Sequence, residues 1–240
     1  MPGSYYLALT GMRARLAALD RLASDIANVS TAGYKAERAT TEQTDRPDFG
    51  AAMIAAIDVS ESASRVDFRP GAIAPTGRDL DVAIDGPGFF AVDTPAGERF
   101  TRDGRFVRRN DGVLTTVEGY PVLGKSGPIT VGNGAIKIDA DGTLRNGAAI
   151  AGRLKLVEFD DTTALSRANT YLFKADGATP DAATHSEVRA GALEQSNVSV
   201  VDRIAELTGV SRSFESMQRA LTTLSNDIDG RAITELGRRG

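Results

Sequence analysis

YYLALTGMRARLAALDRLASDI, residues 5–26, places an apolar side chain at every third or fourth position. These positions are Tyr5, Leu9, Met12, Leu16, Leu19, Ala23 and Ile26. The 4-3-4-3-4-3 spacing keeps one seam on a single helix face, as in coiled coils. Ser4 is a suitable cap, and Asn28 to Ser30 followed by Gly33 supply a stop signal. We therefore expect a first helix of about 25 residues.

The other end of the chain has nearly the same pattern. Its apolar positions are Val200, Ile204, Leu207, Val210, Phe214, Met217, Leu221, Leu224 and Ile228. Ser199 and Asp202 resemble a capping box, and Gly230 is a natural stop, which predicts a helix of about 30 residues. Because helices gain most of their stability from packing an apolar face, both need partners. The partner is either the other helix of the same chain or another subunit.

The middle of the chain has the composition of a β domain. Fifteen of the 25 glycines fall within residues 71–152. Asp-Gly and Asn-Gly pairs, which favour tight hairpin turns, occur at 85–86, 103–104, 111–112, 133–134, 141–142, 146–147 and 176–177. Short β-type runs lie between them, at Leu80 to Ile84, Phe89 to Val92, Val113 to Val117, Ile129 to Val131, Ile136 to Ile138 and Leu154 to Leu156.

These patterns divide the chain into four parts. We expect a first helix and turn at 1–35, an extended arm at 36–75 with a short helix at 51–57, a β domain at 76–189 and a last helix within 190–240. The fold class is α+β. A mainly antiparallel β domain is inserted between terminal heptad helices that pair in a coiled-coil-like layer.

Composition excludes several kinds of function. The net charge of −4 gives no basic excess for a nucleic-acid backbone. With no Cys and one histidine, His185, the chain cannot build a cysteine site or a multi-histidine metal site. We expect no cofactor, no metal and no catalytic residues. The apolar runs are too short to cross a membrane, and the first 30 residues lack the apolar stretch of a cleaved secretory signal.

Two alternatives of a different class stay open at this point. The carboxylate pairs Asp79/Asp81, Asp139/Asp141 and Asp160/Asp161 are compatible with a carbohydrate-active β enzyme, which would need two carboxylates in one cleft. A secreted binding module would need exposed aromatic side chains, yet only 6% of residues are aromatic. Turn formation explains the Asp-Gly pairs without either function.

Three motifs carry a resemblance to a known family. Residues 25–35, DIANVSTAGYK, look like a helix end followed by an N-x-x-T-x-G-Y-K segment, with Ala32 where proline is common. Residues 80–92, LDVAIDGPGFFAV, are followed by 100–106, FTRDGRF, and by GYPVLG at 119–124. Residues 193–198, LEQSNV, precede the last helix. In this order the motifs resemble the rod, hook and axial proteins of the bacterial flagellar basal body.

The resemblance implies a structural subunit rather than an enzyme. It would be exported by the flagellar type III apparatus without a cleaved signal and would polymerise, through its terminal helices, into the periplasmic rod that transmits torque. Its partners would be copies of itself and other rod subunits, without nucleic acid, membrane insertion or a small-molecule substrate. A rod subunit in the proximal position is the first interpretation, and a distal rod or hook-type subunit is the alternative.

Two sets of residues would carry this role. We expect subunit contacts at the seam residues Leu9, Met12, Leu16, Leu19, Ile26, Leu207, Val210, Phe214, Met217, Leu221, Leu224 and Ile228. The positions that match the family motifs are Asn28, Thr31, Gly33, Tyr34, Lys35, Asp85, Gly86, Gly88, Phe89, Phe90, Ser196 and Asn197.

Overall fold

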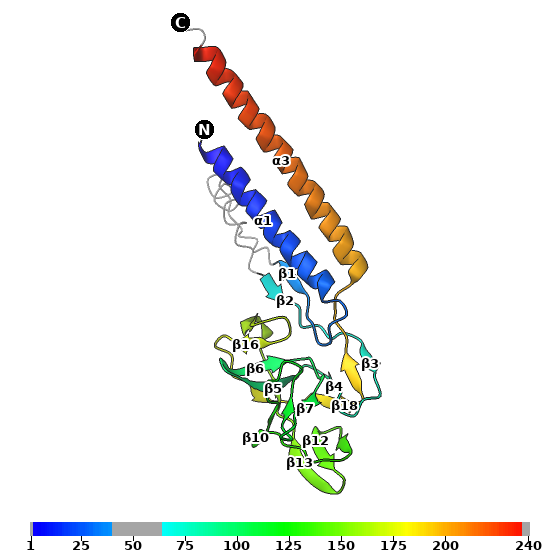
Figure 1. The fold of residues 1–240 in the computed structure, drawn as a ribbon. Coiled ribbons are helices and arrows are strands. Elements are labelled where there is room, and N and C mark those ends of the chain that lie inside the picture. Colours follow the sequence, from blue (N-terminus) through cyan, green and yellow to red (C-terminus); the bar gives the residue numbers. More distant parts are fainter. Residues whose placement is uncertain (1, 40–63, 237–240) are drawn as a thin grey trace. The chain divides into compact units, whose positions relative to one another are not determined.

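A computed structural model describes residues 2–39 and 64–236, with side-chain surroundings given for 11–38 and 64–223. Two long helices, α1 (Pro2–Ala27) and α3 (Val200–Leu236), come before and after a region of short strands in the sequence (Figure 1). The described residues form two compact units. The helical unit contains α1 up to Ile26 and α3 with its cap, Ser199, and the β unit contains residues 27–38 and 65–198.

Both terminal helices are present, and the second is longer than expected. α1 has 26 residues, whereas α3 has 37 and continues past Gly230. A single glycine costs a helix only about 1 kcal/mol, so it does not by itself end one. Ser4 lies inside α1 rather than at its cap, while Ser199 caps α3 as expected, because its Oγ accepts from the Asp202 N–H at 3.4 Å. No helix among the described residues is apolar over a length that could cross a bilayer.

The largest sheet of the β unit has six strands. They are β5 (Phe89–Thr94), β6 (Gly97–Thr101), β14 (Leu156–Glu158), β15 (Leu165–Arg167), β16 (Phe173–Ala175) and β17 (Asp181–Ala182). Their order is β15-β16-β6-β5-β14-β17, and a 3-10 turn, η2 (Thr162–Ala164), leads into β15. A second sheet has the order β11-β12-β13, with β11 (Ile136–Ile138), β12 (Thr143–Asn146) and β13 (Ala149–Arg153).

The remaining strands form two-stranded ribbons, several of which join distant segments. The pairs are β1 (Glu37–Ala39) with β2 (Ser64–Val66), β3 (Ile73–Pro75) with β19 (Ala192–Glu194), β4 (Val82–Asp85) with β18 (Glu187–Ala190), β7 (Val107–Arg108) with β8 (Leu114–Thr115), and β9 (Leu123–Gly124) with β10 (Gly127–Pro128). Every pair whose register is described is antiparallel. The predicted α+β class, with antiparallel strands between terminal helices, is therefore confirmed.

The central strand β5 separates two apolar clusters. Side chains alternate between the faces of a strand, so Phe89 and Ala91 point into one cluster while Phe90 and Val92 point into the other. All four are fully buried. The first cluster is built from phenylalanines that meet edge to face, and Phe68, which precedes β3, packs against Phe89 with ring centroids 5.4 Å apart. Segment 65–75 is thus held on the β unit.

Most of the predicted turns are present. Six of the seven glycines in the Asp-Gly and Asn-Gly pairs have positive φ. The seventh, Gly104, lies where a Cβ would be 1.6 Å from the Val82 carbonyl oxygen, so it allows two backbones to meet instead of forming a hairpin turn. The expected strand at 129–131 is wrong, because this segment bonds to several partners in turn and Thr130 makes only an isolated bridge, to Val113.

The β unit extends beyond the 76–189 range in both directions. Strand β3 lies before residue 76 and pairs with β19, which lies after residue 189. Two parts of the chain that the sequence places outside the β domain therefore close one ribbon. Residues 40–63 of the expected arm, including the short helix at 51–57, lie outside the described residues.

Candidate functional site

The predicted seam of α3 is half-buried from Leu207 to Leu221, whereas Val200 and Ile204 at its start are exposed. Leu207, Val210, Phe214, Met217 and Leu221 are all partly covered. A Cβ placed on Gly11 of α1 would lie 3.3 Å from Met217 Cε, so this face contacts α1. Leu224 and Ile228 lie beyond the side chains that the structure describes.

The predicted seam of α1 is more exposed. Met12, Leu19 and Ile26 are half-buried, while Leu16 keeps 51% of its surface accessible. Leu22, which the heptad pattern does not include, is instead fully buried. Leu9 precedes the described side chains. The described seam residues of α1 therefore remain partly available for contact.

Three buried charged residues, one from each family motif, lie in contact with one another in the β unit. We call Lys35, Arg102 and Glu194 the charge cluster. Lys35 Nζ lies 2.6 Å from Glu194 Oε1, and Arg102 Nη1 lies 3.2 Å from Glu194 Oε2. All three side chains are at most 2% exposed. The Gly71 N–H also donates to Glu194 Oε1, at 2.8 Å.

The electrostatics of this cluster are unbalanced. Two cations share one carboxylate, so a net positive charge is buried. Burial lowers the pKa of Lys35, and the Glu194 carboxylate offsets this effect only in part. Burial lowers the pKa of Arg102 in the same way. Glu194 is therefore the group that makes burial of both cations tolerable.

The cluster connects four separate segments of the chain. Lys35 Nζ donates to the Arg69 carbonyl at 2.9 Å, and Arg102 Nη2 donates to the Gly86 carbonyl at 2.8 Å. Arg102 also stacks on Phe89, 4.9 Å from the ring centroid. Segments 33–38, 67–71, 86–103 and 192–197 thus meet at one buried point.

Asn197 makes a second link between these segments. Its Oδ1 accepts from the Ala36 N–H at 2.7 Å, and its Nδ2 donates to the carbonyls of Asp67 at 2.7 Å and Arg69 at 3.0 Å. Asn197 therefore joins the segment that follows α1 to the segment that precedes α3. Its neighbour Ser196 only orders the backbone locally, since its Oγ accepts from the Val198 N–H.

Gly33 lies at a close backbone approach in this region. Its φ is +67°, and a Cβ there would lie 2.3 Å from the Arg102 carbonyl carbon. The Gly33 N–H donates to the Glu194 carbonyl at 2.8 Å. Since α1 ends at Ala27, Gly33 does not end the helix as the sequence suggests. The glycine instead lets the backbone at residue 33 pack directly against the backbone at Arg102.

The other motif residues support the same contacts. The Arg167 guanidinium lies 4.7 Å from the centroid of the buried Tyr34 ring and donates to the Lys35 carbonyl. Thr31 Oγ1 donates to Asn28 Oδ1 at 3.2 Å, which closes the turn after α1. The remaining motif positions lie on and around β4 and β5: Asp85 pairs with Arg189, Gly88 N–H donates to Ser186 Oγ, and Phe90 is in the core.

Sequence reasoning missed the charged partners in this site. Glu194, Arg102, Arg167 and Asp67 carry much of the geometry but were not singled out. Glu194 and Arg102 do lie inside the motifs LEQSNV and FTRDGRF. A charged residue inside a short motif between apolar runs is the sequence signal that could have indicated a buried ion pair.

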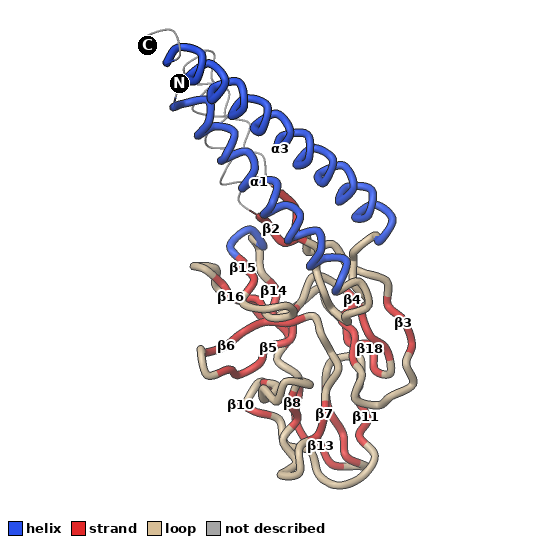
Figure 2. The backbone as a smooth tube through the Cα atoms, turned by 45° about the horizontal axis from the view of Figure 1, so that its top comes forward, coloured by secondary structure: helices blue, strands red, loops and turns tan. Residues whose placement is uncertain are grey.

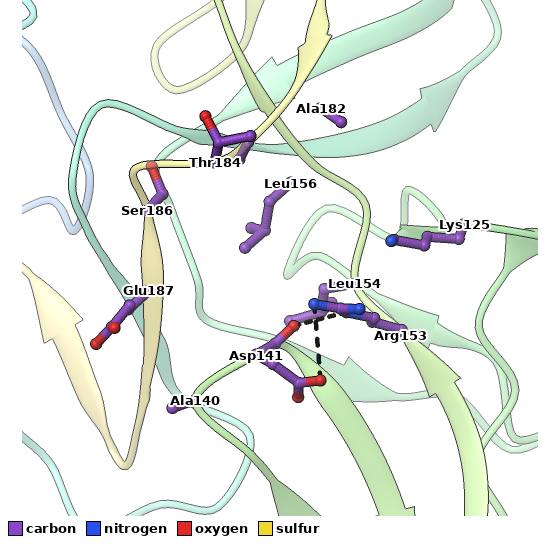
Figure 3. Close-up of a pocket in the computed structure, with 11 residues that line it drawn as sticks. Lys125, Ala140, Asp141, Arg153, Leu154, Leu156, Ala182, Thr184, Ser186 and Glu187 are labelled. Atoms are coloured by element: carbon purple, nitrogen blue, oxygen red, sulfur yellow. Dashed lines mark hydrogen bonds and ion pairs between the residues drawn. The ribbon is translucent and has the colours of Figure 1, made fainter.

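A cavity of about 360 Å³ lies elsewhere on the β unit (Figure 3). Asp141 and Arg153 form an ion pair of 3.6 Å at its wall. Hydrogen bonds from Thr143 hold the pKa of Asp141 below its usual value, which is the opposite of what a general acid requires. Among the described residues, no group of three or more His, Asp or Glu is placed to hold a metal ion.

Glu158, Ser186 and His185 beside this cavity do not form a nucleophile and base. Ser186 Oγ donates to Glu158 Oε1 at 2.7 Å, whereas a catalytic serine would donate to a histidine nitrogen. Burial alone would raise the pKa of Glu158, but hydrogen bonds from Ser186 and His185 lower it. The geometry does not favour acid–base chemistry here.

A fragment comparison tests whether the motifs complete the β unit. A fragment of residues 27–198 should unfold cooperatively on heating. Residues 36–190 alone should melt at least about 10 °C lower, because that fragment lacks Lys35, Glu194 and strand β19. Equal melting temperatures by circular dichroism would show that these contacts do not stabilise the unit.

Comparison with known proteins gives a consistent result. Residues 83–146 match the family model of the flagellar hook protein FlgE/F/G D1 domain, and residues 189–233 match that of the flagellar basal body rod FlgEFG protein C-terminal region. The chain is 32% identical to the flagellar basal-body rod protein FlgF of Caulobacter vibrioides and 34% identical to that of Rhizobium meliloti, over 99% of each chain. It is 31% identical to FlgG of Bacillus subtilis, over 92% of this chain and 94% of the relative.

Proposed function

The chain belongs to the flagellar basal-body rod family of FlgE, FlgF and FlgG proteins, and we propose that its terminal helices build it into the rod. It is a structural rod subunit of the flagellar basal body, and it is most like FlgF, with FlgG close behind. The observation that carries the proposal is the pairing of two terminal heptad helices with apolar residues of α1 left half-exposed.

The proposed subunit contacts are the seam residues. Burying a leucine or methionine side chain stabilises a contact by about 1.5–3 kcal/mol. About half of the Leu16 side chain stays accessible in the single chain. In a helical assembly each copy offers the same surface to the next without closing a ring, so a modest contact is repeated along the rod. Met12, Leu19 and Ile26 extend the same line on α1.

The charge cluster supports a mechanical role for the motif residues. The chain leaves α1 through segment 28–38 and enters α3 through segment 194–199, and Lys35, Glu194 and Asn197 join these segments within the β unit. A subunit that transmits torque needs such a connection to resist relative movement. Buried, hydrogen-bonded charges give directional contacts that apolar packing does not.

The partners follow from this role. They are copies of this chain, other rod subunits and the flagellar export apparatus that delivers them, and the place of action is the periplasmic rod. The function is structural rather than catalytic, which the lowered pKa of Asp141 and the hydrogen bonding of Ser186 favour.

Leu16→Asp tests the helix contacts. Since Leu16 is half-exposed, the substitution should lower the free energy of unfolding of the monomer by only about 1–2 kcal/mol, from partial loss of burial and lower helix propensity. It should nevertheless abolish rod assembly and swimming, because it places a charge in the proposed subunit contact. Thermal unfolding and motility assays measure the two effects.

Ile150→Asp is the matched control. Ile150 is 66% exposed on β13 and lies outside the proposed contacts. Cells with this variant should swim. Normal swimming of Leu16→Asp cells would argue that the α1 seam makes no subunit contact.

A further inference from the structure

Three contacts between α1 and α3 share one antiparallel alignment. Arg203 Nε lies 3.2 Å from Asp25 Oδ2, Arg15 Nε donates to Ser213 Oγ at 2.7 Å, and Gly11 faces Met217. Asp25 and Arg15 are ten residues apart on α1, and their partners Arg203 and Ser213 are ten residues apart on α3 in the opposite direction. The next four residues on each helix lead to Gly11 and Met217. The helices, which lie side by side in Figures 1 and 2, keep this register over the described contact.

The ion pair at one end of this contact is buried. The Asp25 side chain is 0% exposed and that of Arg203 is 14% exposed. Arg203 Nη1 also lies 2.8 Å from Glu206 Oε2, which holds the guanidinium in place on α3. A buried carboxylate without a cation is costly, so an alignment that separates this pair is disfavoured.

The apolar side chains of α1 do not set the alignment. Gly11, Arg15 and Asp25 of α1 contact α3, and Ala18 and Leu22 continue the same face at 4-3-4-3 spacing. Each of these positions comes one residue before a seam position predicted from the sequence, and only Leu22 is a large apolar residue. Gly11 and Ala18 are small, so they can pack against any of the large residues of α3. A slip of one heptad would therefore keep most apolar packing, but it would place Asp25 opposite Val210.

We propose that the Asp25–Arg203 ion pair, supported by Arg15 and Ser213, determines the register of the α1–α3 pair within the chain. Polar residues at seam positions of coiled coils specify alignment in this way, at a cost in stability. This role goes beyond the proposed rod function, since it concerns the isolated subunit. It selects one intrachain alignment among those that two heptad helices allow.

Disulfide trapping in the full chain tests the proposal, and the absence of native cysteine makes it clean. Ala18→Cys with Val210→Cys reports the observed register, because both positions lie three residues from the Arg15–Ser213 contact. Ala18→Cys with Met217→Cys reports a slip of one heptad. In the otherwise unchanged chain, the first pair should form an intrachain disulfide at least about tenfold faster than the second.

The deciding background is Asp25→Leu with Arg203→Leu. Helix content by circular dichroism should be retained, since an apolar pair can replace a buried ion pair, and the difference between the two trapping rates should largely disappear. The control is Glu215→Leu with Arg219→Leu, an exposed ion pair on α3, which should leave the difference intact. Either a preserved preference or a loss of helix in the deciding background would overturn the proposal, because the pair would then act only on stability or not at all.

Discussion

Gly33→Ala is expected to destabilise the β unit by roughly 3 kcal/mol or more and to abolish rod assembly. Two effects add at this position. The φ of +67° is unfavourable for any residue with a Cβ, and that Cβ would lie 2.3 Å from the Arg102 carbonyl carbon. Backbone cannot move aside as a flexible side chain can, so segment 33–38 would separate from the unit. Denaturant unfolding of the purified protein measures the loss.

Gly191→Ala separates these two effects. Gly191 has a φ of +70°, nearly the same as Gly33, but no atom lies within 4 Å of a Cβ placed on it. Its substitution should cost only about 1–2 kcal/mol, the conformational penalty alone. If both substitutions destabilised the protein equally, the close approach at Gly33 would not matter.

Glu194→Gln is expected to have an effect of similar size. The substitution keeps the shape of the side chain but leaves Lys35 and Arg102 buried without a counter-ion. Removing one partner of a buried ion pair typically costs about 3–5 kcal/mol. Because the charge cluster joins the segment that follows α1 to the segment that precedes α3, the variant should also fail to assemble. Chemical unfolding and electron microscopy of basal bodies measure these outcomes.

Glu98→Gln is the matched control. Glu98 also accepts from a lysine at 2.6 Å, Lys155, but both side chains are about one-third exposed. Exposed pairs contribute about 0–1 kcal/mol, so this variant should be nearly as stable as the unchanged protein. A comparable loss in both variants would mean that burial is not what makes Glu194 important.

The sequence predicted the parts of the fold that depend on local pattern. The heptad spacing of residues 5–26 marked α1, and Asp-Gly and Asn-Gly pairs marked turns, because both signals act within a few residues. The resemblance to the flagellar axial proteins, read from short motifs, is confirmed by relatives that match along the whole chain.

The contacts within the site could not be predicted in the same way. Lys35 and Glu194 are 159 residues apart, and no periodicity relates them. The face of α1 toward α3 also differs by one residue from the apolar seam, because contact with α3 depends on Asp25, Arg15 and Gly11 rather than on the largest apolar side chains. Hydropathy identifies which residues gain from burial, but it does not identify the partner that buries them.

Electron microscopy of basal bodies from cells that lack this gene tests the central claim most directly. If the chain is a structural subunit of the rod, these basal bodies should have incomplete rods, and restoring the unchanged gene should restore complete ones. Complete rods in cells without the gene would contradict the assignment.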